Sequence, residues 1–464
     1  MHRFSIIISH IKEVSIIKIA LVNPYFPSVQ REKEGQDALG LLYLATVVDS
    51  FSEVYLFDSI IDSMDEEEIA QEIIQLNPAL IGFTLKFAAS IKSTVKIVQM
   101  LKHDGYKGII VMGGNTATFL YEYMIKGEFT DVIVFHEGEQ TFYELAKAIK
   151  ESDKLGLKAK LYKINGIAFR DDQGNIFRTK DRGFIEDIDS IAFPIRKHYD
   201  SYYRKSSSIY MFSSRGCCYS CFYCSTTKMW GNRWRGRSPE NLILEIKDIL
   251  KHYPNIDNFN FVDDNFMVSR KRVERFIELI HKERLTNKTY NFSARAEHLD
   301  FDILTRLQSI GCSRIFLGIE SGSPKVLKLL NRGYSPTKVI EKVDYAEKIG
   351  IKVAASFMIG LPFEELEDIN MTLQLIKEIP ASNIQCHIFT PFPGTPCYEN
   401  PEAFGMELTK CSPAEINLDS DAFLNTSTFS KEQLALLHRK ALSLIRQKQF
   451  VKHAKTARNN TKAR

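Results

Sequence analysis

The sequence predicts an α/β protein built from two successive parallel-sheet regions and a helical C-terminal extension. Short apolar runs alternate with helical stretches from Lys18 to about Lys150, and the same alternation resumes at Ser206. Runs that are apolar on both faces are typical of parallel strands covered by helices. The chain has 464 residues, more than the roughly 250–300 that a single hydrophobic core supports, so two domains are expected.

Residues 18–150 are predicted to form a doubly wound, Rossmann-like domain. Strands are expected at IKIALVNP, VYLFDS, ALIGFTL, IIVMGG and VIVFHEGE, with helical stretches between them. In open sheets of this kind, ligands bind at the carboxyl ends of the strands. The loops at those ends carry Gly113, Gly114, Gly138 and Glu139.

Residues 151–205 are predicted to be a connector that holds one hairpin, because a turn at residues 172–175 separates two alternating runs. Residues 206–400 are predicted to form a partial (β/α)6 barrel, open rather than closed like the eight-unit form. Its strands are expected at SIYMFSS, NFNFVDD, YNFSARA, RIFLGIE, KVAASFMIG and NIQCHIFT.

Residues 401–464 are predicted to form a helical C-terminal extension that ends in a disordered basic tail. The helix is expected at SKEQLALLHRKALSLIRQKQF. The tail has no apolar periodicity and no aromatic residues between its charges, so a solvated terminus is favoured over a nucleic-acid-binding arm. Its charged residues are Lys452, Lys455, Arg458, Lys462 and Arg464.

The composition is that of a folded globular protein. Hydrophobic residues make up 44% of the chain, charged residues 25%, and the formal net charge is only +4, which excludes wholesale disorder. The apolar run Ile6–Ile8 is interrupted by His10 and Lys12, and no stretch approaches the about 18 apolar residues of a membrane span. We therefore expect a cytoplasmic protein with neither a membrane nor a nucleic acid as its partner.

Four of the eight cysteines crowd into the loop SSRGCCYSCFYCSTT, after the first predicted barrel strand. They permit two frames, Cys217-x3-Cys221-x2-Cys224 and Cys218-x2-Cys221-x2-Cys224. The second frame suits a bacterial ferredoxin, but Lys228 stands where that motif needs a further cysteine. Zinc sites want four ligands, typically in two separated pairs, and no second pair is present. Three thiolates favour an iron-sulfur cluster with one iron open to an external donor, leaving Cys218 as a buried or spare thiol.

The frame C-x3-C-x2-C after a strand, with the aromatic Tyr223 before its last cysteine, resembles the signature of the radical S-adenosylmethionine (SAM) superfamily. The resemblance implies that Cys217, Cys221 and Cys224 hold a four-iron four-sulfur cluster, whose open iron chelates the amino and carboxylate groups of SAM. One electron then cleaves SAM to methionine and a 5′-deoxyadenosyl radical, which abstracts hydrogen from a substrate.

Later strand ends resemble the same family. In that resemblance Asp263 and Asp264 lie near the SAM amine, where a carboxylate would pair with an ammonium. Arg295 matches the basic contact to the SAM carboxylate. Glu320 matches the ribose-binding position, and Gly318 beside it allows close backbone approach. The segment FMIGLPFEE resembles the part of the fifth strand that borders the adenine.

The N-terminal half resembles the cobalamin-binding-type domain found in front of many radical SAM enzymes. The resemblance implies that the glycine loops at residues 113–114 and 138–139 lie near the nucleotide tail of cobalamin. The D-x-H-x-x-G segment that supplies a histidine to cobalt in the classical cobalamin fold is absent, and His103 and His136 lack that context. Two expectations stay open: cobalamin bound without a protein nitrogen on cobalt, or a domain that binds nothing.

The sequence and its resemblances favour a radical SAM enzyme that uses cobalamin to methylate an unactivated carbon of a secondary metabolite or a peptide. One alternative is a radical dehydratase, cyclase or rearrangement enzyme that does not use cobalamin. Another is a non-catalytic iron-sulfur electron carrier, which would not need polar residues at successive strand ends. The enzyme readings imply a flavodoxin or ferredoxin as electron donor.

No catalytic acid or base is assigned from the sequence. Four side chains are expected near strand ends or the cysteine loop, and for each of them ordinary packing is the favoured explanation. They are Tyr210, Tyr219, Cys386 and His387.

Overall fold

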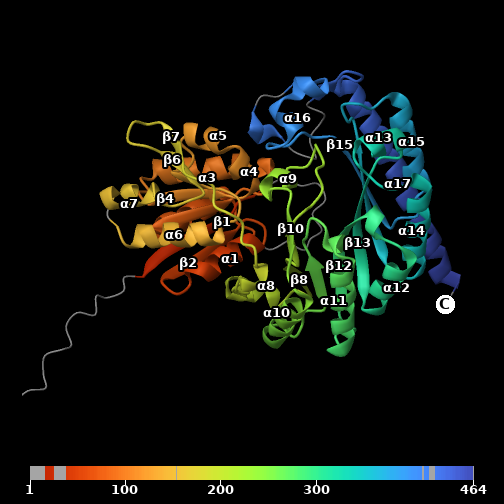
Figure 1. Ribbon diagram of the computed structural model, residues 1–464, viewed down its shortest axis with the longest axis horizontal. Helices are drawn as coiled ribbons and strands as arrows, with labels where there is room; N and C mark the ends of the chain where they lie inside the picture. Colours follow the sequence, from red (N-terminus) through yellow and green to blue (C-terminus); the bar gives the residue numbers. More distant parts are fainter. Residues whose placement is uncertain (1–15, 26–37, 153, 410–411, 417–423, 463–464) are drawn as a thin grey trace, which may run out of the picture. The chain divides into compact units, whose positions relative to one another are not determined.

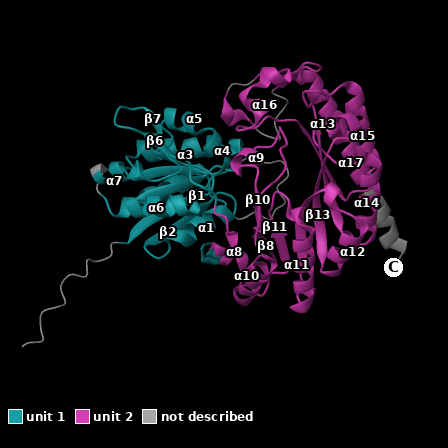
Figure 2. Cartoon of the chain, in the orientation of Figure 1, with its two compact units in different colours: residues 1–26, 38–184, 192–198 teal, residues 27–37, 185–191, 199–464 magenta. Residues whose placement is uncertain are grey.

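A computed structural model of the chain describes residues 16–25, 38–152, 154–409, 412–416 and 424–462. The run Ile6–Ile8 lies outside the described residues. The chain divides into two compact units (Figure 2). Unit 1 comprises Met1–Phe26, Ala38–Phe184 and Ala192–His198, and unit 2 comprises Pro27–Asp37, Ile185–Ile191 and Tyr199–Arg464.

Unit 1 contains a seven-stranded sheet of order β2-β1-β3-β4-β5-β6-β7 (Figure 1). Its first five strands are parallel, so the predicted doubly wound arrangement is confirmed. The strands are β1 (Ile17–Asn23), β2 (Ser52–Asp58), β3 (Leu80–Thr84), β4 (Ile109–Gly113), β5 (Val132–Val134), β6 (Ile167–Arg170) and β7 (Ile176–Arg178).

The hairpin expected in the connector is β6 and β7, and it joins the sheet of unit 1 rather than standing apart. β6 pairs antiparallel with β5, so that Val132 lies opposite Phe169. Ile167, Ala168 and Phe169 are all buried, and an antiparallel pair at this edge covers the backbone groups of β5. Unit 1 accordingly continues to Phe184.

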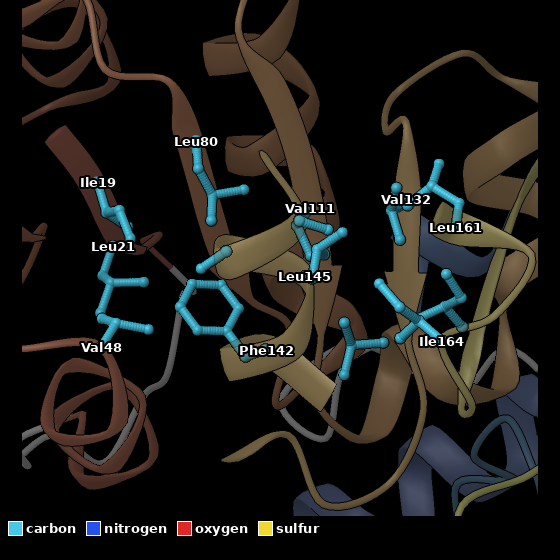
Figure 3. Packing of buried hydrophobic residues seen from close by; sticks show 14 of the residues in the cluster. Ile19, Leu21, Val48, Leu80, Val111, Val132, Phe142, Leu145, Leu161 and Ile164 are labelled. Atoms are coloured by element: carbon cyan, nitrogen blue, oxygen red, sulfur yellow. The ribbon is translucent and has the colours of Figure 1, made fainter. Parts of the chain in front are cut away.

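Helices cover both faces of this sheet. Ile19 and Leu21 of β1 pack with Phe142 in one hydrophobic cluster (Figure 3). Ala20 and Val22 point to the opposite face and are also 0% exposed, so that face is covered too. The helices are α1 (Leu39–Val48), α2 (Glu66–Leu76), α3 (Ile91–His103), α4 (Asn115–Phe119), α5 (Tyr121–Lys126), α6 (Glu139–Lys150) and α7 (Lys154–Leu161).

Unit 2 contains a six-stranded parallel sheet of order β15-β14-β13-β12-β11-β8. All six strands occur where the sequence predicted them, and β8 and β15 are the two edges of the sheet. The predicted open partial barrel is therefore confirmed. The strands are β8 (Ser208–Met211), β11 (Asn258–Phe261), β12 (Thr289–Arg295), β13 (Cys312–Glu320), β14 (Lys352–Ile359) and β15 (Asn383–Ile388).

The helices between these strands start at polar caps. Ser238, Ser269, Asp300 and Ser335 each accept a hydrogen bond from a backbone N–H in the first turn of the following helix. Those helices are α10 (Pro239–His252), α11 (Arg270–Lys282), α12 (Phe301–Ser309) and α14 (Pro336–Lys348), and α15 (Leu366–Glu378) follows β14. The shorter elements are α8 (Asp200–Tyr203), α9 (Thr226–Met229), α13 (Pro324–Leu329) and α16 (Pro396–Glu399), with the strand pairs β9 (Ser214–Gly216) and β10 (Trp234–Gly236), and β16 (Met406–Leu408) and β17 (Leu424–Thr426).

The C-terminal extension ends in α17 (Lys431–Lys462), which packs against β15 and α15. The backbone of this helix is described through Lys462, and the disorder expected of the basic tail stays a prediction. Lysine, alanine, arginine and glutamine have high helix propensity, so the absence of an apolar stripe does not by itself end a helix. Among the described residues, we find no helix with the length and apolar character needed to span a membrane.

Candidate active site

The cysteine loop leaves the end of β9 and returns through β10, which pairs antiparallel with β9. Gly216 immediately precedes the first cysteine of the predicted frame and has φ +84°. A Cβ atom at this position would lie 2.1 Å from the carbonyl oxygen of Arg233. Only glycine therefore fits, and its conformation directs the chain from the strand into the loop.

The three thiols of the predicted frame lie partly buried in this loop, whereas Cys218 is exposed. The pKa of Cys217 is raised to about 11, chiefly by burial and in smaller part by the negative charges of Asp264 and Cys224. Thiolates held together in this way need a shared cation, so the chemistry of the donor set fits an iron-sulfur cluster. No three metal-binding side chains among the described residues converge on a single ion. A cubane cluster needs no such convergence, because each cysteine binds a different iron.

Asp263, at the end of β11, anchors the strand that leads into the cysteine loop. It is 5% exposed, and its Oδ1 accepts hydrogen bonds from the backbone N–H groups of Ser213 and Ser214 at 2.8 and 2.7 Å. Its Oδ2 accepts a hydrogen bond from the hydroxyl of Ser213. Both carboxylate oxygens are thus engaged by the chain itself.

Its neighbour Asp264 faces the cysteine loop. Its Oδ1 accepts a hydrogen bond from the hydroxyl of Thr226 at 3.2 Å, and its charge raises the pKa values of Cys217 and Cys224. The two neighbouring aspartates therefore have separate positions, one beneath the loop backbone and one beside the thiols.

Arg295, the last residue of β12, contacts the cysteine loop directly. Its Nη1 lies 3.5 Å from the Sγ of Cys221, and its guanidinium lies 3.7 Å from the ring centre of Tyr219. Nη2 donates to Glu297 at 2.7 Å and to the carbonyl of Asn331 at 2.9 Å. A fixed positive charge thus lies beside one of the thiols.

Glu320, the last residue of β13, is paired with a second arginine. Nη2 of Arg332 donates to Oε1 of Glu320 and to the hydroxyl of Tyr223, both at 2.5 Å. Glu320 has φ +68°, at a register shift between β13 and β14. A Cβ on Gly318 would lie 2.6 Å from its Oε1, so the glycine leaves room for the carboxylate. Burial raises the pKa of Glu320, and Arg332 opposes that rise.

Three buried polar atoms in this network have no hydrogen-bond partner among the described residues. They are Nε of Arg295, Nε of Arg332 and Oε2 of Glu297. Buried polar atoms are nearly always paired, and each one left alone destabilises the fold. Two donors and an acceptor around the ends of β12 and β13 therefore fit a charged, polar ligand with the chemistry of SAM.

The sequence analysis missed Arg332, Glu297 and His298. Arg332 lies in the loop NRGY between α13 and α14, away from any strand end, so strand-end position gave no signal for it. His298 follows Arg295 by three residues and lies 2.7 Å from the Tyr219 hydroxyl through its Nε2. Glu297 and His298 could have been found from the sequence by one signal, because they follow the expected site residue Arg295 by two and three positions.

The remaining candidates have ordinary surroundings. Cys386 is buried in β15, which raises its thiol pKa to about 12, and its carbonyl lies 2.8 Å from Nε2 of His438. Tyr210 and His387 are half-buried residues of β8 and β15. Tyr219, by contrast, contacts the guanidinium of Arg295 with its ring and Nε2 of His298 with its hydroxyl.

In unit 1, the glycines lie at the carboxyl ends of the parallel strands. Gly114 has φ +95°, and a Cβ there would lie 3.0 Å from the carbonyl oxygen of Leu85. Gly138 is the cap of α6 and Glu139 its first residue. The hydroxyls of Ser59, after β2, and of Ser93, in the first turn of α3, are buried and have no hydrogen-bond partner in the part of the chain that the structure describes. Glycines and unsatisfied hydroxyls at this edge fit the polar nucleotide portion of cobalamin.

Two family models match the chain. The model described as the radical SAM superfamily matches residues 211–376, and the model described as the B12 binding domain matches residues 35–146. The first range contains strands β11 to β14 of unit 2, and the second contains strands β2 to β5 of unit 1.

Similar proteins span most of the chain. An uncharacterized methyltransferase, PH0819, from Pyrococcus horikoshii is 29% identical over 435 residues, which is 92% of each chain. An anaerobic magnesium-protoporphyrin IX monomethyl ester cyclase from Rubrivivax gelatinosus is 24% identical over 388 residues, 81% of this chain and 68% of the cyclase. The solved structure of the radical SAM methyltransferase TsrM from Kitasatospora setae, with cobalamin and a [4Fe-4S] cluster bound, shares the fold. Its TM-score is 0.71 at 17% identity, covering 86% of this chain and 84% of TsrM. The chain belongs to the radical SAM superfamily, in the subgroup that carries a B12-binding domain in front of the radical SAM domain.

Proposed function

We propose that the protein is a cobalamin-dependent radical SAM methyltransferase acting on an unactivated carbon of a secondary metabolite or a peptide. The observation that carries the proposal is the occurrence in one chain of the polar network around the cysteine loop and of a B12-binding sheet. The proteins PH0819 and TsrM, which resemble the chain over most of its length, are both named methyltransferases.

In this proposal Cys217, Cys221 and Cys224 hold the cluster, and Cys218 does not. The cluster supplies the electron that cleaves SAM to methionine and the 5′-deoxyadenosyl radical. Gly216 fixes the first turn of the loop, and Asp263 holds the strand before it. These contacts keep the loop in place while the reaction proceeds.

The polar network binds SAM. Arg295 pairs with the carboxylate of SAM, because its buried Nε has no hydrogen-bond partner among the residues that the structure describes. Asp264 faces the loop and pairs with the ammonium. Glu320 accepts the ribose hydroxyls, and Arg332 holds that carboxylate ionised and oriented. Tyr223 is held by the same guanidinium beside the last cysteine.

The carboxyl edge of the sheet in unit 1 holds cobalamin, which supplies the methyl group. Gly113, Gly114, Gly138 and Glu139 border the nucleotide tail. Ser59 and Ser93 offer their buried hydroxyls to its polar groups. The chain lacks Asp-x-His in this region, so we propose that no protein nitrogen binds cobalt.

Other components follow from this chemistry. We infer that reduced flavodoxin or ferredoxin supplies the electron and that the protein acts in the cytoplasm, where thiols remain reduced. Neither a nucleic acid nor a membrane is required. The radical dehydratase, cyclase or rearrangement reading differs in one observable, because it needs no cobalamin.

The test is anaerobic purification from a cobalamin-replete host, followed by reconstitution of the cluster and incubation with SAM and dithionite. Retained cobalamin together with 5′-deoxyadenosine and S-adenosylhomocysteine, the remnant of SAM after loss of its methyl group, is the expected result. Deoxyadenosine without cobalamin or S-adenosylhomocysteine would favour the dehydratase, cyclase or rearrangement reading. A protein that binds the cluster but cleaves no SAM would be an electron carrier.

A further inference from the structure

The segment 395–405, at the start of the C-terminal extension, contacts the cysteine loop. Phe404 ends the short helix η6 (Pro401–Phe404), and its ring stacks on that of Phe222 with centroids 5.6 Å apart and an interplanar angle of 16°. Phe222 lies between Cys221 and Cys224 in the chain. A residue about 180 positions further along the chain thus packs on the centre of the predicted ligand frame.

A second contact holds the backbone of the same residue. The thiol of Cys397 lies 3.7 Å from the carbonyl oxygen of Phe222 and 3.2 Å from Oγ1 of Thr395. Cys397 is 0% exposed, and Thr395 accepts the backbone N–H of Tyr398 at the start of α16. The thiol is therefore held in one place, and the loop carbonyl has a fixed neighbour.

A third contact joins the helix that closes the loop to the same segment. Nζ of Lys228, in α9, lies 2.5 and 2.6 Å from the two carboxylate oxygens of Glu399, in α16. Both side chains are largely exposed, so this ion pair contributes less than the buried contacts. Figure 1 shows α9 and α16 at the same end of unit 2.

Two further rings complete the contact around Phe222. The ring centre of Phe363, in the turn after β14, lies 6.1 Å from the ring centre of Phe222. The ring centre of Phe389, after β15, lies 6.3 Å from it. Phe389 is buried, whereas Phe363 is 42% exposed. Edge-to-face and stacked rings at these separations attract one another beyond their hydrophobic burial. The ring of Phe222 is thus held by two strand ends and by the C-terminal extension.

We propose that residues 395–405 are a positioning segment that holds the cysteine loop in the conformation that accepts the cluster. The proposal rests on the proposed function, because it takes Cys217, Cys221 and Cys224 as the ligands. A loop that is ordered before binding loses less conformational entropy when the cluster binds. The segment acts through Phe222, so its expected effect is on retention of the cluster.

The test compares Phe404→Ala with Phe404→Tyr, which keeps the ring, and with Phe301→Ala as a matched control. Phe301 is 50% exposed, and its ring contacts that of Tyr345 in α14. Each protein is reconstituted anaerobically, and release of iron to a ferrous chelator is followed by absorbance. We expect release from Phe404→Ala to be about two- to tenfold faster than from the native chain. Phe404→Tyr and Phe301→Ala are expected to match the native chain.

A second measurement separates positioning from folding. The thermal unfolding of the cluster-free proteins is compared, and Glu399→Gln, a surface change that leaves every ring in place, is carried through both assays. Faster iron release from Phe404→Ala and, to a smaller extent, from Glu399→Gln, with unfolding temperatures of the cluster-free proteins unchanged, supports the proposal. The proposal is overturned if Phe404→Ala releases iron at the same rate as the native chain. It is also overturned if its faster release is matched by a proportionally lower unfolding temperature of the cluster-free protein. Failure of the native chain to take up a cluster would instead contradict the proposed function.

Discussion

Gly216 gives the sharpest prediction at the scale of a single residue. Alanine there adds a Cβ only 2.1 Å from the carbonyl oxygen of Arg233, at φ +84°. The strain of the left-handed conformation alone is about 1–2 kcal/mol, and the steric contact adds to it. We expect Gly216→Ala to lower both the unfolding temperature and the iron content after reconstitution.

Gly174 supplies the matched control for this change. It has the same φ of +84° but no atom within 4 Å of the added Cβ. Gly174→Ala is expected to show only the backbone strain, with full iron content. Equal iron loss in the two variants would contradict a steric role for Gly216.

Arg332 gives a prediction about SAM. Arg332→Lys keeps the positive charge near Glu320 but cannot donate to both Glu320 and Tyr223 from a planar fork. Loss of one charge-assisted hydrogen bond weakens SAM binding by about 1.5–3 kcal/mol, which is roughly 10- to 150-fold in affinity. Equilibrium binding of SAM to the reconstituted protein measures this change. An unaltered affinity would remove Arg332 from the binding network.

Glu364 predicts a dependence of stability on pH. The side chain is fully buried, and its Oε2 accepts the N–H groups of Gly360 and Leu361. Burial raises its pKa to about 7, so between the unfolded pKa of about 4.3 and pH 7 the folded state holds a proton that the unfolded state has lost. The stability that this proton contributes is present below the unfolded pKa and is lost as the pH rises through 7.

The variant Glu364→Gln stays neutral and keeps an acceptor for the two N–H groups. Denaturant unfolding at a series of pH values is expected to show the native chain losing roughly 2–3 kcal/mol relative to this variant between pH 4.5 and 8. The exposed Glu367→Gln is the control, and it should run parallel to the native chain. A constant difference between native and Glu364→Gln across this range would contradict the raised pKa.

At the scale of elements, a lysine side chain of α17 attaches this helix to the end of α15. Nζ of Lys448 donates to the carbonyls of Ile376 and Lys377 at 2.9 and 2.7 Å, at the C-terminal end of α15. A positive charge there satisfies carbonyls that the helix leaves unpaired. Lys448→Met should lower the free energy of unfolding by about 1–2 kcal/mol, while the exposed Lys440→Met should leave it unchanged. If denaturant unfolding gave the same free energy of unfolding for the two variants, this attachment would be contradicted.

The sequence predicted the strands of both sheets well, because each buried parallel strand is a short apolar run between helical stretches. It could not predict which edge β6 and β7 would join, since their pairing with β5 depends on residues far apart in the chain. The pairing of β9 with β10 was missed for a related reason. Both strands are only three residues long and carry few apolar residues. Their antiparallel pairing, with Gly216 packed against the carbonyl oxygen of Arg233, becomes visible only in the structure.

The candidate site was predictable only in part. Cysteine spacing and strand ends identified Cys217, Arg295 and Glu320 before the structure. They could not separate the neighbours Asp263 and Asp264, because a residue pair at a strand end gives no information on which side chain meets the backbone. Arg332 is brought to Glu320 by a loop that follows β13, and loop conformation is set by tertiary packing rather than by local pattern.

At the scale of the whole molecule, each unit contains a sheet of parallel strands, and near their carboxyl ends lie buried polar groups that have no hydrogen-bond partner in the described ranges of the chain. In unit 2 these groups belong to the network around Arg295 and Glu297, and in unit 1 to Ser59 and Ser93. Two such edges in one chain are what an enzyme that uses both SAM and cobalamin requires. The radical SAM model matches residues 211–376, within unit 2, and the B12 binding model matches residues 35–146, where all described residues belong to unit 1.

The most direct test of the central claim is the iron and sulfide content, with the visible and electron paramagnetic resonance spectra, of two serine variants after anaerobic reconstitution. Cys218→Ser is expected to hold a full four-iron cluster and to cleave SAM, because the exposed Cys218 lies outside the ligand frame. Cys217→Ser is expected to lose the intact cluster and SAM cleavage. The reverse result, a cluster lost from Cys218→Ser and kept by Cys217→Ser, would contradict the assigned frame and with it the proposed radical chemistry.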